Sequence, residues 1–386
     1  MAVTVLRVSV GGSIVPASEH RPTRAEIDLD AIRQNVAHIK ALLAAGTEVM
    51  AVVKANGYGH GALPVARAAL QAGATQLGVA TVDEAAELRQ GGITAPVLVL
   101  GPTTPAAMRL ARDLGVTVTV HSLETARAAR EIEGLRVHLK VDTGMGRLGF
   151  PATDEGVRAV AEAKKLLSDR AEGIFTHLSD ADNEDQGYTL AQLDRFEAVL
   201  KELAGRGFEF RFVHAANSAA TLALKRAHYN LVRPGLAVYG LYPAPWQKNL
   251  CELRPALSLK TAIDSIKELP AGWGISYGHT VMLDKPRRVG VLPAGYADGV
   301  RRGLSGRLWV LVGGRRVKTL GRVCMDQIVV DLQDVGDPRP GDEAVLLGCQ
   351  GNECITADEW AEITGTINYE IVTGVSARVP RVYLHP

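Results

Sequence analysis

The sequence has few cysteines. Cys251, Cys324, Cys349 and Cys354 are the four in 386 residues, and all lie in the last third of the chain. No histidine or second cysteine pair stands at zinc-ligand spacing around Cys349 and Cys354. We therefore expect no metal site here, and we expect four free thiols of the kind that persist in the cytoplasm.

Long apolar runs and an excess of one charge are also missing. No stretch reaches the roughly 20 apolar residues of a membrane-spanning helix, and residues 1–12 lack the basic leader and long apolar core of a signal peptide. With 43 basic and 42 acidic residues, the net charge is only +1. This balance gives no electrostatic signature of nucleic-acid or membrane binding. Walker and nucleophile-elbow motifs are absent. These absences predict a cytoplasmic globular protein with a small-molecule ligand.

The chain divides into three parts by pattern. Hydrophobic residues make up 47% and charged residues 22%, which is typical of a folded globular protein. Residues 1–22 form an N-terminal arm that is either loose or one stray strand. Residues 23–245 alternate strand and helix, and residues 246–386 are turn-rich and mainly β. A strand near residues 24–29 belongs either with the barrel or with the β domain.

Eight short apolar runs in the second part predict buried strands. They span residues 49–53, 77–80, 97–100, 117–120, 137–141, 173–175, 212–214 and 231–233. Eight strands alternating with helices predict a (β/α)8 TIM-type barrel. A doubly wound sheet also fits the alternation, but the count of eight favours the barrel. Asp30 is expected to cap a helix at 31–45, and Thr81 and Glu84 have capping-box spacing.

The stretch 50–61 reads M-A-V-V-K-A-N-G-Y-G-H-G and places Lys54 at the end of the first strand. A buried amine is costly unless it is paired, neutral or covalently bound. The glycines after it allow close backbone approach, and a helix beyond them attracts phosphate. The combination indicates a Schiff-base lysine that holds a phosphorylated aldehyde cofactor. The alternative is a lysine that reaches solvent.

Polar residues follow other strands at the rim where barrel enzymes place their sites. They lie at 142–147, 176–177, 214–218 and 233–235. Each has a structural alternative: Arg147 as a surface charge, His177 as a core histidine, Arg233 as the partner of a buried acid. Asn217 and Ser218 are also a plausible helix cap, a role compatible with phosphate binding.

Several motifs, in this order, resemble those of the alanine racemase family. They are V-V-K-A-N-G-Y-G-H-G, K-V-D-T-G-M-G-R-L-G, H-A-A-N-S-A-A-T-L, V-R-P-G-L-A-V-Y-G, I-S-Y-G-H-T, G-Y-A-D-G, G-R-V-C-M-D-Q and S-A-R-V-P-R. The match runs from about Glu26 to Arg381. Gly57 stands where alanine is usual, and the N-terminal arm is longer than the family requires.

The resemblance implies an isomerase that interconverts L-alanine and D-alanine and supplies D-alanine for peptidoglycan. It implies pyridoxal 5′-phosphate bound to Lys54 as a Schiff base. Arg233 would face the pyridine nitrogen, and His177 would connect Arg233 to Tyr277. The implied cofactor-binding residues are Lys54, Tyr58, His177, Ser218, Arg233, Gly235 and Tyr369.

The resemblance also implies a homodimer in which the β domain of one subunit completes the barrel site of the other. Lys54 and Tyr277 are then the two catalytic bases, on opposite faces of the substrate. Arg147 and the backbone of Met325 are implied to bind the substrate carboxylate. The supporting residues are Asn217, Lys140 (often carbamylated in the family), Tyr296, and Arg301 or Arg302 at the substrate entrance.

Three alternatives stay open. A racemase of other or broader specificity, such as for serine, differs only in its pocket. A barrel-type decarboxylase should carry a cysteine followed by Asp or Glu in the second domain, whereas Cys324 is followed by Met325. A cofactor carrier without turnover is a barrel alone, whereas this chain has a second domain.

Overall fold

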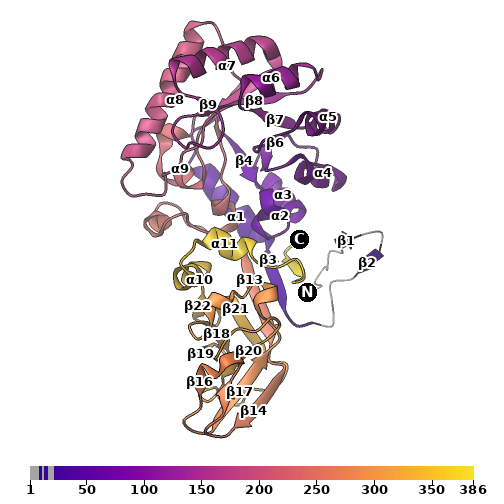
Figure 1. Cartoon of the computed structure of the whole chain (residues 1–386), viewed down its shortest axis with the longest axis vertical. Coiled ribbons are helices and arrows are strands. Elements are labelled where there is room, and N and C mark those ends of the chain that lie inside the picture. The colour runs from indigo at the N-terminus through magenta and orange to yellow at the C-terminus, as the bar shows by residue number, and fades with distance from the viewer. Residues whose placement is uncertain (1–7, 11–12, 16–20) are drawn as a thin grey trace. The chain divides into compact units, whose positions relative to one another are not determined.

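The computed structural model describes residues 8–10, 13–15 and 21–386, and its chain separates into two compact units (Figure 1). The barrel unit is Ala31–Arg254. The β unit comprises Pro255–Pro386 together with the described residues up to Asp30. The strand near residues 24–29 therefore lies in the β unit. The predicted boundary at residue 245 falls at a short 3-10 helix, η4 (Pro245–Asn249), within the barrel unit.

Of the predicted arm, residues 1–22, the structure describes two short strands and its last two residues. β1 (Val8–Val10) and β2 (Ser13–Val15) pair antiparallel. The rest of the arm lies outside the described residues.

The eight predicted strands all form, and the prediction of a barrel is confirmed. They are β4 (Glu48–Val52), β5 (Gln76–Val79), β6 (Val97–Val99), β7 (Thr117–Val120), β8 (Val137–Asp142), β10 (Ala171–Phe175), β11 (Phe212–His214) and β12 (Leu231–Val232). All pair in parallel, in the order β11-β10-β8-β7-β6-β5-β4-β12, so the ladder is open only between β11 and β12. A short strand, β9 (Phe150–Pro151), extends β8.

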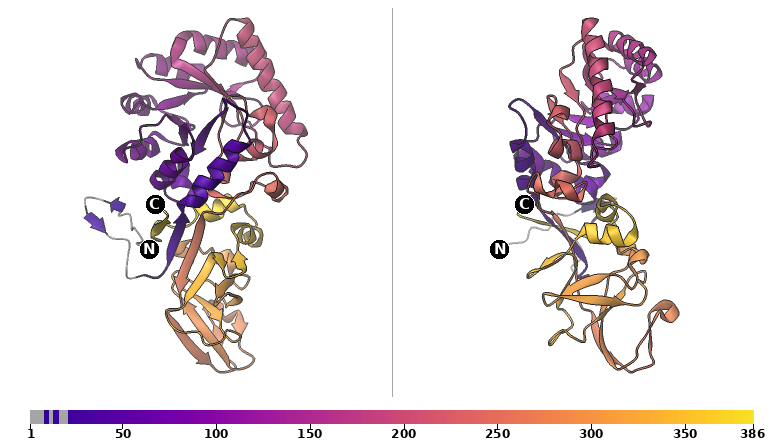
Figure 2. Two further views of the ribbon diagram at one scale, coloured as in Figure 1. Left: turned by 180° about the vertical axis from the view of Figure 1, so that it is seen from behind. Right: turned by 90° about the vertical axis from the view of Figure 1, so that its left-hand side faces the viewer.

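Helices alternate with these strands and lie around them (Figure 2). They are α1 (Leu29–Ala41), α3 (Ala62–Gln71), α4 (Val82–Gln90), α5 (Pro105–Asp113), α6 (Leu123–Arg130), α7 (Asp154–Leu167), α8 (Gly187–Gly205) and α9 (Ser218–Ala223). The predicted Asp30 cap is wrong. The Asp28 carboxylate accepts the Asp30 N–H at 3.0 Å, so α1 begins before Asp30. Among the described helices, none is long and apolar enough to cross a membrane.

Residues from distant strands meet inside the barrel. Met50, Leu98, Phe212 and Leu231 form one buried cluster, with Leu100 packed against it. Parallel strands covered by helices are buried on both faces, which is why these segments read as apolar runs. Each such side chain stabilises the fold by about 1.5–3 kcal/mol, and together they hold the strand ends that carry the site.

The β unit is built on one mixed sheet. Its strands are β3 (Arg24–Asp28), β13 (Leu257–Ala262), β14 (Ser265–Leu269), β17 (Arg287–Leu292), β18 (Trp309–Val312), β19 (Arg315–Leu320), β20 (Ile328–Asp331), β21 (Glu343–Gln350), β22 (Glu353–Ile355) and β23 (Arg381–Leu384). All pairs are antiparallel except β23 with β3. A hairpin, β15 (Gly274–Ile275) and β16 (Val281–Met282), and two helices, α10 (Ala357–Thr364) and α11 (Asn368–Thr373), complete the unit. The sequence did not predict α11.

The expectation of four free thiols is wrong for two of them. Cys349 of β21 lies directly opposite Cys354 of β22, with their Cα atoms 4.0 Å apart, and the two form a disulfide. Opposed residues of an antiparallel hairpin are close enough to bridge, but the register that opposes them is set by the fold. Cys251 and Cys324 are free.

Candidate active site

Lys54 begins an unusual turn directly after β4. In α2 (Lys54–Tyr58), residues Ala55, Asn56 and Tyr58 have φ between 50 and 52°, and Gly57 has φ 59°. The left-handed conformation costs a residue with a side chain roughly 1–2 kcal/mol. Such strain persists where the surrounding structure imposes it, and it gathers at functional sites.

Glu84 of α4 holds this turn in place. Its carboxylate accepts the Ala55 N–H and the Ala80 N–H, each at 2.7 Å. The predicted capping box is therefore only half formed: Thr81 accepts the Glu84 N–H at 3.2 Å, but the Glu84 side chain bonds elsewhere. Glu84 thereby joins the end of β5 to the turn that carries Lys54.

A small polar cradle lies between Tyr58, Ser218 and Gly235. The Ser218 hydroxyl accepts the N–H groups of Gly235 at 2.8 Å and Ala237 at 3.2 Å. The Tyr58 side chain is buried, and a Cβ atom at Gly235 would lie 2.3 Å from its hydroxyl. Hydroxyls and backbone N–H groups beside a helix start are suited to phosphate, so these residues fit the phosphate of the implied cofactor.

Asn217 is a helix cap, which is the structural alternative that the sequence offered for it. Its side-chain oxygen accepts the Ala220 N–H at 3.0 Å and caps α9, while its amide donates to the Leu178 carbonyl at 3.1 Å. It positions Ser218 as the first residue of the helix. Its predicted supporting role stays a prediction.

Arg233 follows β12 and is only 3% exposed. It donates to His214 Nδ1 at 2.7 Å, to His177 Nδ1 at 3.2 Å, and to the carbonyls of Thr176 and Ala215 at 2.8 and 3.1 Å. The predicted alternative, a buried acid as its partner, is not seen. Burial lowers the pKa of Arg233 to about 9, which still leaves the guanidinium protonated at neutral pH.

The histidines around Arg233 are neutral. Burial, and then the charge of Arg233, holds the pKa of His177 and of His214 well below the ordinary value. Each therefore carries one ring N–H, and the nitrogen that accepts from Arg233 is unprotonated. Arg233 and His177 are therefore in contact, as the resemblance implied.

The loop that carries Arg147 is folded around one carboxylate. Asp142 accepts the N–H groups of Gly144, Met145, Gly146 and Arg147 at 2.9–3.1 Å. Burial raises the pKa of Asp142, but these four hydrogen bonds outweigh it and hold the pKa below its usual range. Asp142 therefore stays an anion and fixes the backbone from which the exposed Arg147 extends.

Burial and nearby positive charges lower the pKa values of two lysines, Lys54 and Lys140. Burial lowers the pKa of Lys54, and the charge of Arg147 lowers it further. Burial and the charges of Arg147 and Arg233 lower the pKa of Lys140 to about 8. A lysine amine that is readily neutral is a better base and nucleophile. Lys140 also lies 5.5 Å from the centre of the Phe175 ring.

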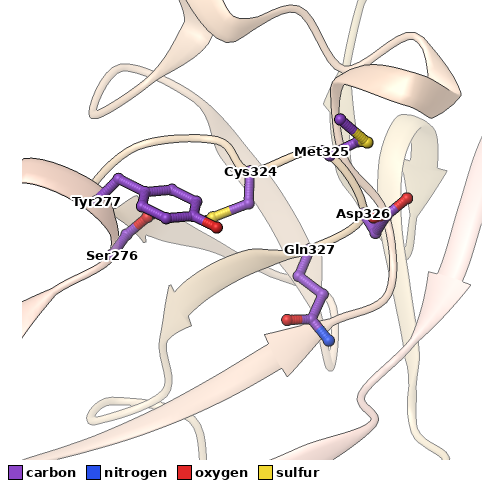
Figure 3. Close-up of a pocket in the computed structure, with 6 residues that line it drawn as sticks. All are labelled: Ser276, Tyr277, Cys324, Met325, Asp326 and Gln327. Atoms are coloured by element: carbon purple, nitrogen blue, oxygen red, sulfur yellow. The ribbon is translucent and has the colours of Figure 1, made fainter.

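The remaining predicted residues belong to the β unit. Tyr277 and Met325 line one surface concavity with Ser276, Cys324, Asp326 and Gln327, and Figure 3 shows the tyrosine ring beside Cys324. Tyr277 is 70% exposed. The Tyr296 N–H donates to the Cys324 carbonyl at 3.0 Å.

The other predicted residues of this unit lie near one helix. Tyr369 is half-buried in α11, and Arg301 forms an ion pair at 2.7 Å with Glu370 of the same helix. Arg302 is exposed and begins a 3-10 turn, η7 (Arg302–Leu304). Their roles stay predictions.

Sequence reasoning missed two residues of the barrel site. Glu84 was interpreted as a cap, because its distant partner, the Ala55 N–H, has no local signature. His138 was not singled out, although it stands two residues before Lys140 in the same strand. Alternate positions of a strand share one face, so this pair was a readable sign of polar groups inside the barrel.

In the part of the chain that the structure describes, no three His, Cys, Asp or Glu side chains are grouped to hold a metal ion. The barrel instead gathers a lysine, a phosphate cradle and a buried guanidinium at the carboxyl ends of its strands. This fold and site define the class of barrel enzymes that bind pyridoxal 5′-phosphate through a lysine.

Comparison with known proteins gives the family. The family model of the alanine racemase N-terminal domain matches residues 27–243, and that of the C-terminal domain matches residues 256–383. The chain belongs to the alanine racemase family, which confirms the resemblance, and it is therefore a pyridoxal-phosphate-dependent isomerase.

Individual relatives agree over nearly the whole chain. The alanine racemase of Carboxydothermus hydrogenoformans is 47% identical over 94% of this chain and 100% of its own length. That of Symbiobacterium thermophilum is 49% identical over 94% and 97%. The crystal structure of alanine racemase from Bacillus anthracis with bound L-Ala-P superimposes with a TM-score of 0.90 at 41% identity, covering 96% of each chain.

Proposed function

We propose that this enzyme racemises alanine through two bases, Lys54 and Tyr277, and that its working form is a homodimer. One observation carries the proposal. In the barrel unit the charge of Arg147 acts on Lys54, and Ser218 binds the Gly235 backbone, whereas Tyr277 and Met325 line one concavity of the β unit. The named relatives are alanine racemases, and one was solved with L-Ala-P bound.

The barrel residues would hold the cofactor at both ends. Lys54 would bind it covalently, and Tyr58, Ser218 and the Gly235 backbone would hold its phosphate. When bound, pyridoxal phosphate supplies the electron sink that makes the α-hydrogen of the amino acid acidic. Tyr369 is a further phosphate ligand in this proposal.

Racemisation must remove a proton from one face of the α-carbon and return one to the other. Lys54 acts on one face, where its lowered pKa helps to keep the amine neutral. The phenol of Tyr277 acts on the other face. Two bases on opposite faces need no movement of one group across the substrate plane.

Arg147 and the Met325 N–H bind the substrate carboxylate in this proposal, a charge-assisted contact that orients the α-hydrogen. Lys140, whose lowered pKa favours reaction at its amine, supports Arg147. Tyr296, with Arg301 or Arg302, belongs to the substrate entrance.

Arg233 sets the strength of the electron sink. With the cofactor bound, the protonated guanidinium would donate a hydrogen bond to the pyridine nitrogen, which would then carry no proton of its own. The sink would then be weaker, and side reactions such as transamination would be suppressed. His177, which accepts from Arg233 through Nδ1, has its other ring nitrogen available to connect to Tyr277 of the partner subunit.

The cellular setting follows from the same proposal. The enzyme works in the cytoplasm and supplies D-alanine for peptidoglycan.

One assay tests the substrate. The purified enzyme is incubated separately with L-alanine, L-serine, L-lysine and diaminopimelate, and products are resolved by chiral chromatography. We expect D-alanine to form fastest. If serine racemises faster than alanine, serine is the preferred substrate. Release of carbon dioxide would indicate a decarboxylase, and no product from any of the four would indicate a carrier.

A further inference from the structure

A line of buried hydrogen bonds continues from Arg233 into the barrel interior, away from the residues already assigned. Arg233 Nη1 lies 2.7 Å from His214 Nδ1, and His214 Nε2 lies 2.8 Å from His138 Nδ1. His138 Nε2 then faces the Glu172 carboxylate at 3.9 Å. His214, His138 and Glu172 come from three different strands, β11, β8 and β10 respectively.

The direction of every bond in this line is fixed by Arg233. A guanidinium only donates, so Nδ1 of His214 must accept and be unprotonated. A neutral His214 then carries its proton on Nε2 and donates to Nδ1 of His138. His138 carries its own proton on Nε2, which points toward Glu172. Both rings are neutral because burial, before any charge, lowers the pKa of His138 to about 3 and of His214 well below its ordinary value.

The rings are clamped in this arrangement. A Cβ atom at Gly173 would lie 2.6 Å from three atoms of the His138 ring, so only glycine admits that ring. His214 stacks on Phe175, with centroids 4.7 Å apart and planes within 7°, and His138 stacks on Phe212 at 5.6 Å. Neither ring can turn without displacing a packed aromatic side chain.

The gap between His138 and Glu172 opens on a cavity of about 40 Å³, lined by both residues and by Gln76, Thr117, Arg136 and Arg211 among others. A cavity needs roughly 10–15 Å³ to hold one water molecule. The distance of 3.9 Å is too long for a direct hydrogen bond but leaves a charge attraction and room for one bridging water. The carboxylate also accepts from the Thr117 hydroxyl at 3.2 Å.

We propose that His214, His138 and Glu172 are positioning residues: they hold the Arg233 guanidinium at one orientation and support its charge from inside the barrel. Hydrogen-bonded chains polarise one another in a low-dielectric interior, so the Glu172 carboxylate strengthens His214 as an acceptor two bonds away. The inferred support of Arg233 rests on its proposed contact with the pyridine nitrogen. The positions of the protons on the two histidines do not depend on that contact.

The first measurement is the tautomeric state of both rings, by ¹⁵N NMR of histidine-labelled enzyme before and after removal of pyridoxal phosphate. We expect Nε2–H with unprotonated Nδ1 for His138 and His214 in both samples. A proton on Nδ1 of either ring, or an imidazolium, would overturn the proposal whatever the enzyme catalyses. Expected tautomers with no racemase activity would instead refute the proposed function alone.

The second measurement is the dissociation constant of pyridoxal phosphate in matched variants. In His214→Asn the side-chain oxygen replaces Nδ1 and keeps the bond from Arg233, whereas His214→Phe keeps the ring and removes the acceptor. We expect His214→Phe to weaken cofactor binding about tenfold, the lower end of the loss seen when an outer-shell partner is removed at metal sites, and to shift the visible absorption of the bound cofactor. His214→Asn should stay within about threefold of the parent.

Glu172→Gln removes the charge and keeps the shape, and Thr117→Val removes the neighbouring hydroxyl and keeps the charge. We expect Glu172→Gln to weaken cofactor binding about threefold and Thr117→Val to leave it unchanged. Equal effects of His214→Asn and His214→Phe, or of Glu172→Gln and Thr117→Val, would show that these groups act only through packing and would contradict the proposal.

Discussion

The hydroxyl of Tyr58 occupies the space that a side chain at Gly235 would need, because a Cβ atom there would lie only 2.3 Å from it. Tyr58 ends the turn that Lys54 begins, and Gly235 follows the last strand of the barrel. This contact therefore brings the first and last strands of the barrel together at the phosphate cradle.

Gly235→Ala should displace Tyr58 and enlarge the cradle. We expect cofactor affinity to fall at least tenfold, with a stability loss of about 1–3 kcal/mol typical of overpacking. Fluorescence titration with pyridoxal phosphate measures the first effect and urea unfolding the second. Gly205→Ala is the control, since a Cβ atom at Gly205 meets nothing within 4 Å. If Gly235→Ala binds the cofactor with unchanged affinity, Gly235 is not part of the site.

Subunit mixing tests whether Lys54 and Tyr277 serve one site from two chains. Lys54→Ala and Tyr277→Phe should each be nearly inactive alone, and Lys54→Ala should lose the borohydride-reducible bond to the cofactor. When the two are unfolded together and refolded, half of the dimers contain one of each chain and one intact site. Racemase activity should then recover to about a quarter of the parent value. A mixture as inactive as its components would argue against a shared site.

The pH dependence of cofactor attachment reports the charge state of Lys54. Only the neutral amine attacks an aldehyde, and burial and Arg147 both lower the pKa of Lys54 from 10.5. The rate of pyridoxal phosphate binding to cofactor-free enzyme should therefore reach half its maximum at a pH below 10.5. Arg147→Gln removes a positive neighbour, so the half-maximum should move to higher pH.

Arg127→Gln is the control for that shift, because Arg127 pairs with Glu162 on the exposed surface of the barrel unit. It should leave the pH profile unchanged. If Arg147→Gln does not change the pH profile, then Arg147 and Lys54 do not interact through charge.

Acid titration of stability tests a buried ion cluster in the β unit. Burial raises the pKa of Asp298, but hydrogen bonds from Arg21, Arg378 and the Gly295 N–H outweigh it and lower the pKa below 3.8. A carboxylate with a lowered pKa stabilises the fold fully above its unfolded pKa and loses that effect as pH falls through the folded pKa. Arg21→Ala should cost about 2 kcal/mol at pH 7 and progressively less below about pH 4.

Arg339→Ala provides the comparison for Arg21→Ala. Arg339 pairs with Asp337 where both side chains are at least 75% exposed, so its loss should change stability by less than about 1 kcal/mol. Urea unfolding at a series of pH values measures both variants. A loss in Arg21→Ala that stays constant down to pH 2 would show that the Asp298 charge is not its cause.

Thiol titration checks the pairing of Cys349 with Cys354. The enzyme unfolded without reductant should expose two thiols, from Cys251 and Cys324, and four after reduction. Closing this short loop should stabilise the fold by about 2 kcal/mol, so Cys354→Ser should lower the unfolding midpoint relative to the oxidised parent and match the reduced parent. Four thiols before reduction would restore the original expectation.

Much of the barrel could be predicted from the sequence because its signals are local. Apolar runs of three to five residues between helix-start residues mark the strands, and all eight runs form strands where they were expected. The polar residues after those runs share one rim because parallel strands point the same way. The family motifs then associated Lys54, Arg147 and Arg233 with a pyridoxal phosphate site.

Other features depended on pairing between distant residues, which no local pattern encodes. The sequence left open whether residues 24–29 join the barrel or the β domain, and hydrogen bonds to β13 and β23 place them in the β unit. Glu84 was taken for a cap, and its partner in the Lys54 turn is 29 residues away. Cys349 and Cys354 became a disulfide through hairpin register.

By itself, then, the sequence determined the strand order along the chain and the barrel, since these follow from periodicity, and its motifs determined the family. Only the tertiary structure decided that the turn after Lys54 is left-handed, that Tyr58 fills the space beside Gly235, and that two histidines continue the line from Arg233. These depend on packing and on hydrogen bonds that close only when distant strands are brought together.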